Sequence, residues 1–389
     1  MTSHIGILGP ATLEMLADEL DAQQHPLPSG YPFPQTSLIV KELLQLGHRV
    51  SLFTLSKGIE APMTVHGARL TVHIGRYRSA HRARDFFEQE VLDLVGLMRR
   101  DPCEVYGAHW LYEFALAGLR YGGPLAVTVH DWPLQVLRHQ PTPYRAARLA
   151  MAMKVLGQFR GELIAVSPYI ARTLRWWTGR SASVIPNGIE ATAFPSTVLN
   201  RASRRSALVS IANGFGRRKN TSTLIRAFAR LRTAVAGVEL HLIGDDHDAK
   251  GAAAAWAISH NLADGIRFLG PLPYAETQEH VGRAIALVHP SLEESFGRTL
   301  IEAMAKGTPV IGGKRSGAVP WVLDSGAAGL LVDVMSDADL ERGMQQLIED
   351  TLLWNALSEQ GQVRASSHYS LEATTRSYAE TLETVRVSA

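Results

Sequence analysis

Short runs of hydrophobic residues alternate with longer segments that carry apolar side chains at helical spacing, along nearly the whole chain. In the first half, the runs that predict strands are residues 4–9, 49–54, 105–109, 125–130 and 163–167. In the second half they are residues 207–213, 239–244, 266–269, 286–290, 309–312 and 330–332. The intervening segments, such as 35–46 and 220–232, are long enough for crossover helices. This alternation predicts an α/β fold whose parallel sheets are covered on both faces.

The pattern restarts after about residue 190, and 389 residues are too many for one ordinary core. Between residues 185 and 205 lie a Pro-Asn-Gly turn, a further proline and a polar run, which together indicate a join. We therefore expect two Rossmann-like domains, residues 1–188 and 189–371, with a C-terminal helix from about 372 to 389 packing back on the first. Ligands of such sheets bind beyond the carboxyl ends of the strands, so both ligand edges are expected to face one interdomain cleft.

Composition narrows the partners only slightly. The formal net charge is +2, which gives no indication of a nucleic-acid partner. No basic leader precedes an apolar segment, and no apolar run is long enough for a membrane span, so a cytoplasmic protein is expected, with any membrane contact peripheral, at the inner face. The single cysteine, Cys103, follows Asp-Pro before an apolar run and is interpreted as a packing residue.

The most informative segment, H-P-S-L-E-E-S-F-G-R-T-L-I-E-A-M-A-K-G-T-P-V-I, spans residues 289–311. It predicts a strand end, a polar loop containing Glu294, a helix containing Glu302, and a second strand, with Gly307 as the residue that ends the helix. The backbone N–H groups at the helix start are suited to a diphosphate, and the carboxylates are suited to sugar hydroxyls. Taken alone, two such glutamates are more often solvated surface charges.

The stretch E-S-F-G-R-T-L-I-E-A-M-A-K-G-T-P-V resembles the retaining glycosyltransferases of family 4, also called glycosyl transferases group 1, which include bacterial lipopolysaccharide and exopolysaccharide enzymes. The resemblance implies the GT-B fold, with an N-terminal acceptor domain and a C-terminal domain for a nucleotide diphosphate sugar. It also implies that Glu294 contacts hydroxyls of the donor sugar and that Glu302 binds the ribose. The residues expected to face the donor sugar and diphosphate are Ser295, Phe296, Gly297, Arg298 and Thr299.

A second donor-side candidate is the basic loop N-G-F-G-R-R-K-N at residues 213–220. Arg217, Arg218 and Lys219 precede a predicted helix, where they would neutralise a leaving diphosphate. The loop resembles the family pattern most closely at Lys219, which we take as a catalytic residue. Gly244 and Leu269 resemble the family's base-binding edges, and Trp321 stands where the family usually has a glutamate.

In the first half, His109 and Trp110 end one predicted strand, and His130 and Asp131 end another. A lone histidine at a strand end is usually structural, but segments of the family resemble both. The resemblance implies that His130, counted with the catalytic residues, lies near the reacting sugar and that His109, Trp110 and Asp131 lie on the acceptor side. The family's diglycine is replaced by Pro-Gln-Thr, so Gln35 and Thr36 are candidates for side-chain contacts there.

Two basic groups have an open interpretation. One is the stretch from Arg76 to Arg84, and the other contains Arg138, Arg145, Arg148 and Lys154. Both are typical of solvated faces, and the alternative is an anionic acceptor or a membrane that carries a lipid-linked one. Peripheral membrane contact is assigned to the Arg76–Arg84 region.

The sequence therefore predicts a retaining hexosyltransferase acting in cell-surface polysaccharide, lipopolysaccharide or glycolipid synthesis. Its partners would be a nucleotide-sugar donor and a sugar, lipid-linked or small-molecule acceptor, with no nucleic acid. No cofactor and no metal ion are expected, because no D-x-D-like site occurs in the predicted cleft loops. Two alternatives stay open: a nucleotide-sugar epimerase of the same fold, and a non-catalytic nucleotide-sugar-binding relative.

Overall fold

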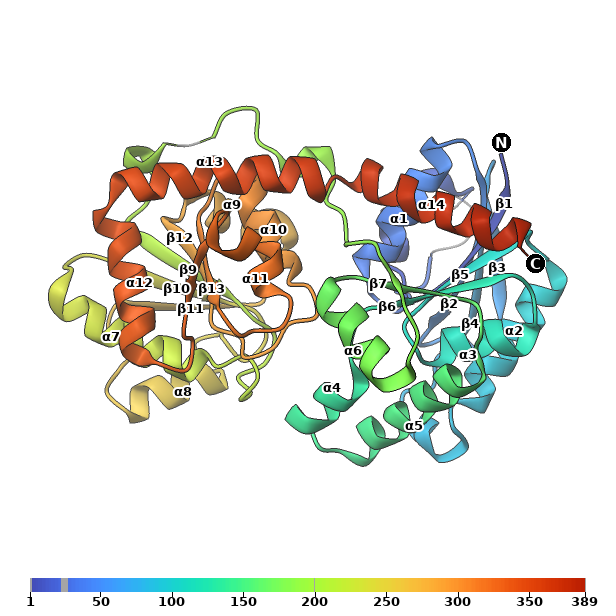
Figure 1. Cartoon of the computed structure of the whole chain (residues 1–389). Coiled ribbons are helices and arrows are strands. Elements are labelled where there is room, and N and C mark those ends of the chain that lie inside the picture. Colours follow the sequence, from blue (N-terminus) through green and yellow to red (C-terminus); the bar gives the residue numbers. More distant parts are fainter. Residues whose placement is uncertain (1, 22–26, 199, 389) are drawn as a thin grey trace. The chain divides into compact units, whose positions relative to one another are not determined.

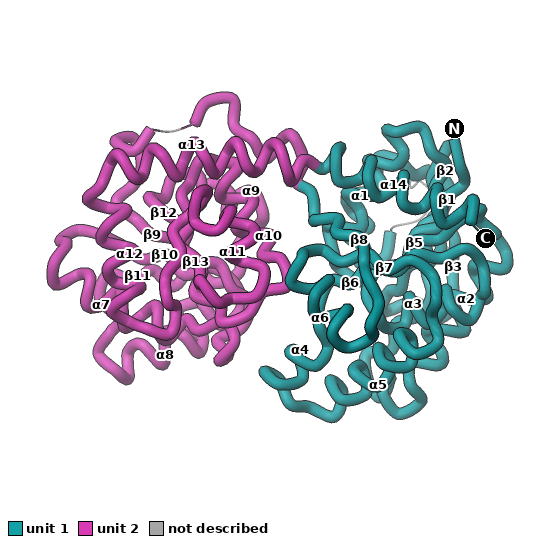
Figure 2. The backbone as a smooth tube through the Cα atoms, viewed as in Figure 1, with its two compact units in different colours: residues 1–188, 371–389 teal, residues 189–370 magenta. Residues whose placement is uncertain are grey.

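The computed structural model describes residues 2–21, 27–198 and 200–388. The chain forms two compact units, Met1–Gly188 with Leu371–Ala389, and Ile189–Ser370 (Figure 2). Each unit has one sheet with helices on both of its faces (Figure 1). Because both faces of each sheet are covered, the strands are nearly continuous hydrophobic runs, as the sequence pattern predicted.

The first unit contains an eight-stranded sheet in the order β3-β4-β2-β1-β5-β6-β7-β8. Its strands are β1 (His4–Leu8), β2 (Arg49–Ser56), β3 (Met63–His66), β4 (Leu70–Arg76), β5 (Val105–His109), β6 (Leu125–Val129), β7 (Glu162–Ala165) and β8 (Ser183–Val184). Sequence reasoning missed β3, β4 and β8. All recorded pairings are parallel except β3 with β4, which corrects the expectation of a wholly parallel sheet. The connection between these two strands is too short for a crossover, so they form a hairpin.

The helices of the first unit are α1 (Pro34–Gln45), α2 (Glu88–Arg100), α3 (Glu113–Tyr121), α4 (Pro133–His139), α5 (Pro143–Gln158), α6 (Pro168–Thr178) and α14 (Leu371–Val387). Short 3-10 turns occur at Leu13–Glu19 and Arg82–Asp85. The start of α6 follows from the Ser-Pro sequence: the Ser167 side chain accepts a hydrogen bond from the Ile170 N–H, and Pro168 occupies the first helical position. Serine at the N-cap followed by proline is a typical helix start.

The second unit contains a six-stranded parallel sheet in the order β11-β10-β9-β12-β13-β14. Its strands are β9 (Ala207–Ile211), β10 (Glu239–Ile243), β11 (Ile266–Gly270), β12 (Ala286–His289), β13 (Val310–Gly313) and β14 (Leu330–Val332). Its helices are α7 (Thr221–Ala234), α8 (Ala252–Ser259), α9 (Tyr274–Arg283), α10 (Arg298–Ala305), α11 (Val319–Val322), α12 (Asp337–Glu349) and α13 (Thr351–His368). The strand order reverses between β9 and β12, and this switch point is where a ligand of such a sheet binds.

The polar run before β9 is anchored in the second unit by one arginine. The Arg204 guanidinium is buried and donates to the carbonyl oxygens of Gly282, Lys306 and Gly307 and to the Thr308 hydroxyl. Burial lowers the pKa of Arg204 to about 10. The predicted join therefore ends as a fixed segment, because both terminal nitrogens of one side chain donate to the end of α9 and to the loop after α10.

The C-terminal helix α14 is held in the first unit by a hydroxyl that fits against a glycine. Tyr378 of α14 is buried, and its Oη lies where a Cβ atom of Gly107, on β5, would stand. The same Oη lies 3.5 Å from Nε2 of His109. Glycine at position 107 therefore leaves the room that allows α14 to pack on β5 and β6.

We expect Gly107→Ala to destabilise the first unit by about 2 kcal/mol, because the added methyl group forces Tyr378 out of its place. Calorimetric unfolding of the full chain measures this. Tyr378→Phe removes the clashing hydroxyl, so the double variant should regain part of the lost stability. If the double variant is no more stable than Gly107→Ala alone, the hydroxyl is not what the glycine accommodates.

Candidate active site at the switch point of the second unit

The loops that follow β9 and β12 are tied together by Asn220. Its backbone is left-handed, with φ 56°, and its buried side chain donates to the carbonyl oxygens of Pro290, at 3.1 Å, and Val334, at 2.7 Å. The Leu292 N–H also donates to the Arg218 carbonyl oxygen at 2.8 Å. These bonds bring the basic loop to the carboxylate loop, which are 75 residues apart in sequence.

Glu294 is the centre of a compact charge cluster. Its Oε1 accepts a hydrogen bond from Nζ of Lys219 at 2.7 Å, and Arg218 Nη1 lies 3.8 Å from the same oxygen. The Nε2 atom of His289, at the end of β12, lies 3.3 Å away. Only 13% of the Glu294 side chain is exposed. Burial by itself raises the pKa of this carboxyl, but Lys219, His289 and Arg218 outweigh burial and hold the pKa well below its ordinary value.

The loop after β13 fixes the backbone of Glu294 from the other side. The Ala318 N–H donates to the Glu294 carbonyl oxygen at 2.9 Å, and the Ser316 hydroxyl donates to the carbonyl oxygen of Ser291 at 2.6 Å. Gly317 has a φ of 64°, and a Cβ atom there would collide with the Glu294 carbonyl oxygen. Glu294 is therefore held by three loops at once. Sequence reasoning missed His289, Ser316 and Gly317.

Helix α10 begins directly after this loop, with Gly297 at its N-cap (φ 92°) and Gly307, as predicted, just beyond its last turn (φ 62°). The first residues of a helix have no intrahelical acceptor for their N–H groups, so the segment from Phe296 to Thr299 presents the positive end of α10. This segment directly follows the residue that pairs with Lys219. Ser295, Gly297, Arg298 and Thr299 are half-buried, and Phe296 is buried.

Glu302 faces a different set of groups, further along α10. Arg298 Nε donates to its Oε1 at 2.7 Å, Gln278 Nε2 donates to Oε2 at 3.2 Å, and Tyr274 Oη lies 3.4 Å from Oε1. The carboxylate is buried, and Tyr274 and Gln278, both from α9, were missed by sequence reasoning. The contact of Glu302 with a ribose stays a prediction. In it, a ribose hydroxyl would donate a hydrogen bond to the carboxylate, which already accepts bonds from Arg298 and Gln278.

The remaining donor-side candidates lie at other strand ends of the same sheet. Gly244 follows β10 with φ 117°, its N–H donates to Gly270, and a side chain there would collide with the Ala212 carbonyl oxygen. Leu269 pairs with Asp248 in an isolated bridge. His247, which follows β10, is buried and forms hydrogen bonds with the Thr221 hydroxyl and the Asp245 carbonyl oxygen. Arg217 is exposed, unlike Arg218 and Lys219.

In the first unit, the two predicted histidines contact each other. His109 Nδ1 and His130 Nε2 are 2.8 Å apart, and Gln35, His109, His130 and Tyr378 line a cavity of about 20 Å³, room for one water molecule. Thr36 is buried against Gly9 beside His109. Burial lowers the pKa of His109 to about 4, and burial together with His109 lowers that of His130 well below its ordinary value.

The more accessible acceptor-side candidates are His130, Trp110 and Asp131, all half-buried. Trp110 has a φ of 70°, a strained conformation for a bulky residue, and its ring lies near those of Phe33 and Tyr31. The Asp131 carboxylate accepts a hydrogen bond from the Tyr112 hydroxyl at 3.0 Å. Gln35, Thr36 and His109 are buried.

Two family models match the chain. The model described as glycosyl transferases group 1 matches residues 200–364, and that described as glycosyltransferase family 4 matches residues 36–193. The chain belongs to the group 1 glycosyltransferases of the GT-B fold.

Named relatives of this group 1 glycosyltransferase agree with that assignment. It is 31% identical over 172 residues to the lipopolysaccharide core biosynthesis glycosyltransferase LpsE of Rhizobium meliloti, covering 43% of this chain and 47% of that protein. It is 30% identical over 279 residues to a D-inositol 3-phosphate glycosyltransferase of Nocardiopsis dassonvillei, covering 65% and 63% of the two chains. The matches thus span about half to two-thirds of these relatives.

Solved structures share the fold along the whole length. The sucrose-phosphate synthase of Thermosynechococcus elongatus superposes with a TM-score of 0.79 at 19% identity, covering all of both chains. Anabaena Alr3699/HepE in complex with UDP and glucose gives 0.70 at 18%, covering 98% of this chain and 100% of that one. WaaG, a glycosyltransferase involved in lipopolysaccharide biosynthesis, gives 0.71 at 15%, covering 97% and 99%.

Two further observations concern membrane-spanning helices and clusters of metal-binding side chains. Within the described residues, no helix is both long enough and apolar enough to cross a membrane. Over the same residues, no three His, Cys, Asp or Glu side chains gather closely enough to hold a metal ion.

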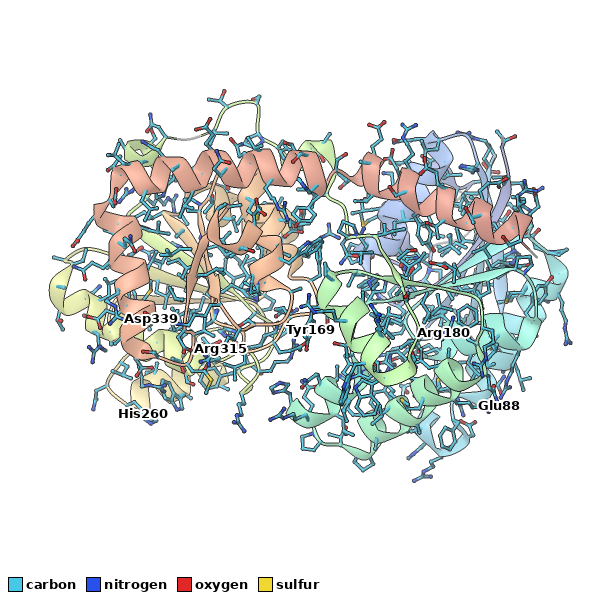
Figure 3. The ribbon with its side chains drawn as sticks, viewed as in Figure 1. Glu88, Tyr169, Arg180, His260, Arg315 and Asp339 are labelled. Carbon is cyan, nitrogen blue, oxygen red and sulfur yellow. The ribbon has the colours of Figure 1, made fainter. Side chains whose placement is uncertain are left out.

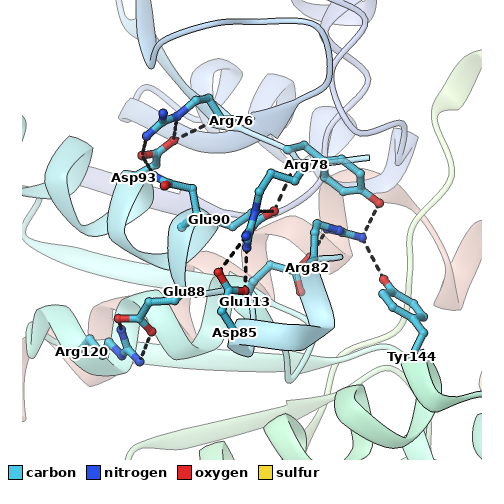
Figure 4. A network of polar contacts seen from close by, with 12 residues as sticks. Arg76, Arg78, Arg82, Asp85, Glu88, Glu90, Asp93, Glu113, Arg120 and Tyr144 are labelled. Carbon is cyan, nitrogen blue, oxygen red and sulfur yellow. Dashed lines mark hydrogen bonds and ion pairs between the residues drawn. The ribbon is translucent and has the colours of Figure 1, made fainter. Parts of the chain in front are cut away.

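Three arginines of the basic stretch from Arg76 to Arg84 lie close to carboxylates within the first unit. Arg76 pairs with Asp93 at 2.7 Å, and Arg78 pairs with Asp85 at 2.7 Å and Glu90 at 2.6 Å (Figure 4). The Arg82 guanidinium is buried between the hydroxyls of Tyr77 and Tyr144 and lies 3.7 Å from Glu113. Arg148, of the other basic group, is buried as well, 3.6 Å from Glu113. Carboxylates therefore offset much of the charge of Arg76, Arg78 and Arg82 within the unit, whereas Arg84 of the same stretch is exposed.

The histidine pair makes the first unit sensitive to acid. In the unfolded chain a histidine takes up a proton near pH 6.5, whereas the folded state keeps His109 neutral down to about pH 4. The free energy of unfolding therefore has its full value above pH 6.5. It falls by on the order of 3 kcal/mol as the pH decreases from 6.5 through 4, because the unfolded chain takes up the proton first.

Unfolding midpoints measured across that pH range for wild type and His109→Gln test this expectation, with exposed His66→Gln as the control. We expect the His109 variant to lose distinctly less stability on acidification than the wild type and the control. Equal losses in all three proteins would mean that His109 is not the group that is forced to ionise.

Proposed function

We propose that this chain is a retaining, metal-independent glycosyltransferase that moves a sugar from a nucleotide diphosphate sugar to a hydroxyl acceptor. The observation that carries the proposal is the Lys219–Glu294 ion pair, with Arg218 beside it, directly before the N-terminus of α10 at the switch point of the second unit. Such a donor consists of an anionic diphosphate and a sugar ring that carries hydroxyl groups. Lys219 and Arg218 are suited to bind the diphosphate, and Glu294 is suited to bind the hydroxyl groups.

Charge favours a diphosphate here. Lys219 and Arg218 carry two positive charges against the single negative charge of Glu294, and the low pKa keeps that carboxyl ionised. A diphosphate adds negative charge beside the two cations and the positive end of α10. As the bond between sugar and phosphate breaks, negative charge grows on the leaving oxygen, so these groups stabilise the transition state more than the bound donor.

Glu294 is suited to the sugar because its carboxylate is fixed and ionised. One of its oxygens is engaged by Lys219. The other oxygen is available in this proposal to accept hydrogen bonds from donor-sugar hydroxyls. The acceptor hydroxyl attacks from the face that the diphosphate leaves, and the leaving phosphate oxygen takes its proton, which gives retention of configuration without a side-chain base. In this proposal the backbone around Gly244 and Leu269 borders the base.

The acceptor class follows from the relatives. These relatives include a lipopolysaccharide core glycosyltransferase, D-inositol 3-phosphate glycosyltransferases and phosphatidyl-myo-inositol mannosyltransferases. The proposed role is therefore in lipopolysaccharide, cell-surface polysaccharide or glycolipid synthesis. The Anabaena structure with UDP and glucose supports a nucleotide-sugar donor for this fold. We propose that the two cations take the place of a divalent ion, so that EDTA leaves transfer unchanged.

Donor binding is tested by thermal shift with UDP, GDP and ADP and their glucose or mannose conjugates. A matching nucleotide at 100 times its Kd should stabilise the chain by about 2.7 kcal/mol. Lys219→Ala and Arg218→Ala should each weaken binding of that nucleoside diphosphate roughly tenfold or more, since each removes a charge-assisted contact. Arg226→Ala, on α7 and paired with Asp337, is the matched control. Equal affinity in all three variants would remove the basic loop from the site.

Transfer is tested with Glu294→Gln, which keeps the shape of the side chain and removes its charge. We expect the transfer rate to fall about 100-fold or more, with the fold intact, because one preorganised transition-state contact is lost. Glu279→Gln, exposed on α9, is the control. The anomeric configuration of the product, read by NMR, tests retention: an inverted product would contradict the front-face mechanism, and wild-type transfer by Glu294→Gln would contradict the role of the carboxylate.

The same assays separate the two other functions considered from the sequence. A nucleotide-sugar epimerase would convert its donor with no acceptor present. A non-catalytic relative would bind the donor and transfer nothing over a broad acceptor panel.

A further inference from the structure

Helices α4, α5 and α6 of the first unit form an unusually basic part of the chain. Between residues 132 and 189 there are eight arginines and lysines and a single acidic residue, Glu162, whereas the remainder of the chain is net acidic. Arg138 at the end of α4 and Arg172 and Arg175 on α6 are exposed. Positive charge is therefore concentrated in this segment of the chain, and apart from buried Arg148, which lies near Glu113, it is not offset by neighbouring acids in the sequence.

Two exposed tryptophans lie among these arginines on α6. The Trp176 side chain is 79% exposed and Trp177 is 40% exposed, and the two rings meet edge to face with centroids 5.2 Å apart. Trp177 also lies 5.6 Å from the ring of buried Trp132, which precedes α4. Tryptophan carries a large apolar surface that folding normally covers. Two of them at one helix end, beside cationic side chains, mark a surface that contacts something.

A shallow groove of about 500 Å³ joins the two helices. Its walls are Leu134 and Gln135 of α4 and Tyr169, Arg172 and the two tryptophans of α6, and Tyr169 is labelled in Figure 3. Further along α4, Val136 and Leu137 are half-buried. The face defined by α4 and the exposed side of α6 is thus apolar, aromatic and cationic together. We refer to it as the α4–α6 face.

We propose that the α4–α6 face docks on an anionic lipid bilayer. A bilayer surface presents negative phosphates above the boundary of its apolar core. Tryptophan rings insert at that boundary, and the guanidinium groups of neighbouring arginines bind the phosphates, so this combination of side chains suits an anionic bilayer. The proposal moves the expected membrane contact away from the Arg76–Arg84 region, where Arg76 and Arg78 pair with carboxylates within the unit.

The docking face is continuous with the acceptor-side residues. Helix α4 begins at Pro133, three residues after His130, and the intervening residues are Asp131 and Trp132. A bilayer at the α4–α6 face would therefore lie next to the edge at which β5 and β6 end. This placement suits an acceptor carried by a lipid, a step that rests on the proposed function, while the docking itself does not.

Co-sedimentation with two kinds of vesicle tests the docking without any measurement of activity. The full chain is mixed with vesicles of phosphatidylcholine alone and of phosphatidylcholine with phosphatidylglycerol. We expect binding to the second kind only, weakened by added salt. Each basic side chain near the surface contributes roughly fivefold to the affinity. Arg172→Glu with Arg175→Glu should therefore weaken binding at least 25-fold.

The matched charge control is Arg342→Glu with Arg376→Glu, which makes the same change in net charge on exposed positions of α12 and α14. Trp176→Ala should also weaken binding several-fold, whereas Leu352→Ala, 82% exposed on α13, should not. Brominated lipids should quench wild-type tryptophan emission, and Trp176→Phe with Trp177→Phe should lose that quenching while still binding.

Three outcomes would overturn the proposal: no binding to either vesicle, equal binding to both, or undiminished binding by the α6 charge-reversal variant. If vesicles are not bound but Trp176→Ala abolishes self-association in sedimentation velocity, the face is an interface between copies of this chain. Transfer to a soluble acceptor should be unaffected by the α6 variants, so loss of docking and failure of the proposed function give separate results.

Discussion

The ion pair between Lys219 and Glu294 is the contact on which the rest of the site depends. It joins the loop after β9 to the loop after β12, the two strands between which the sheet order reverses. Asn220 reinforces the junction with bonds to the ends of β12 and β14. Because the pair is mostly shielded from water, its attraction is stronger than that of a surface pair, and either partner alone would be a costly, uncompensated charge.

The same principle explains how the two kinds of arginine in this chain differ. Arg76, Arg78 and Arg82 are used inside the first unit, where acidic residues and tyrosines surround them. Arg172 and Arg175 lie on a helix segment that has no acid in its sequence neighbourhood. Identical side chains thus hold a fold together in one place and leave positive charge exposed in another. What separates them is whether the fold brings a carboxylate within reach.

Much of the fold could be predicted from the sequence. The alternating pattern predicted strands and helices of both sheets closely, and the segment from Glu294 to Val310 indicated a loop, a helix and a glycine that ends it, all of which occur. Three elements were missed: β3 and β4, which form a hairpin directly after β2, and β8, which has only two residues. The hydrophobic signals of β3 and β8 are too short to distinguish from a loop, whereas β4 has seven residues with apolar side chains at alternating positions, so its pattern was present and was overlooked.

By itself the sequence determined the fold class, the join between the two units and the loops in which Lys219 and Glu294 lie, because periodicity and motif spacing are local properties of the chain. Only the tertiary structure decided which charges meet. His289 lies beside Glu294 in the tertiary structure, and Glu302 accepts hydrogen bonds from Arg298 and Gln278. His109 is buried next to Tyr378, which comes from the C-terminal helix. Burial and pairing of polar groups depend on contacts between segments distant in sequence, and no local pattern carries that information.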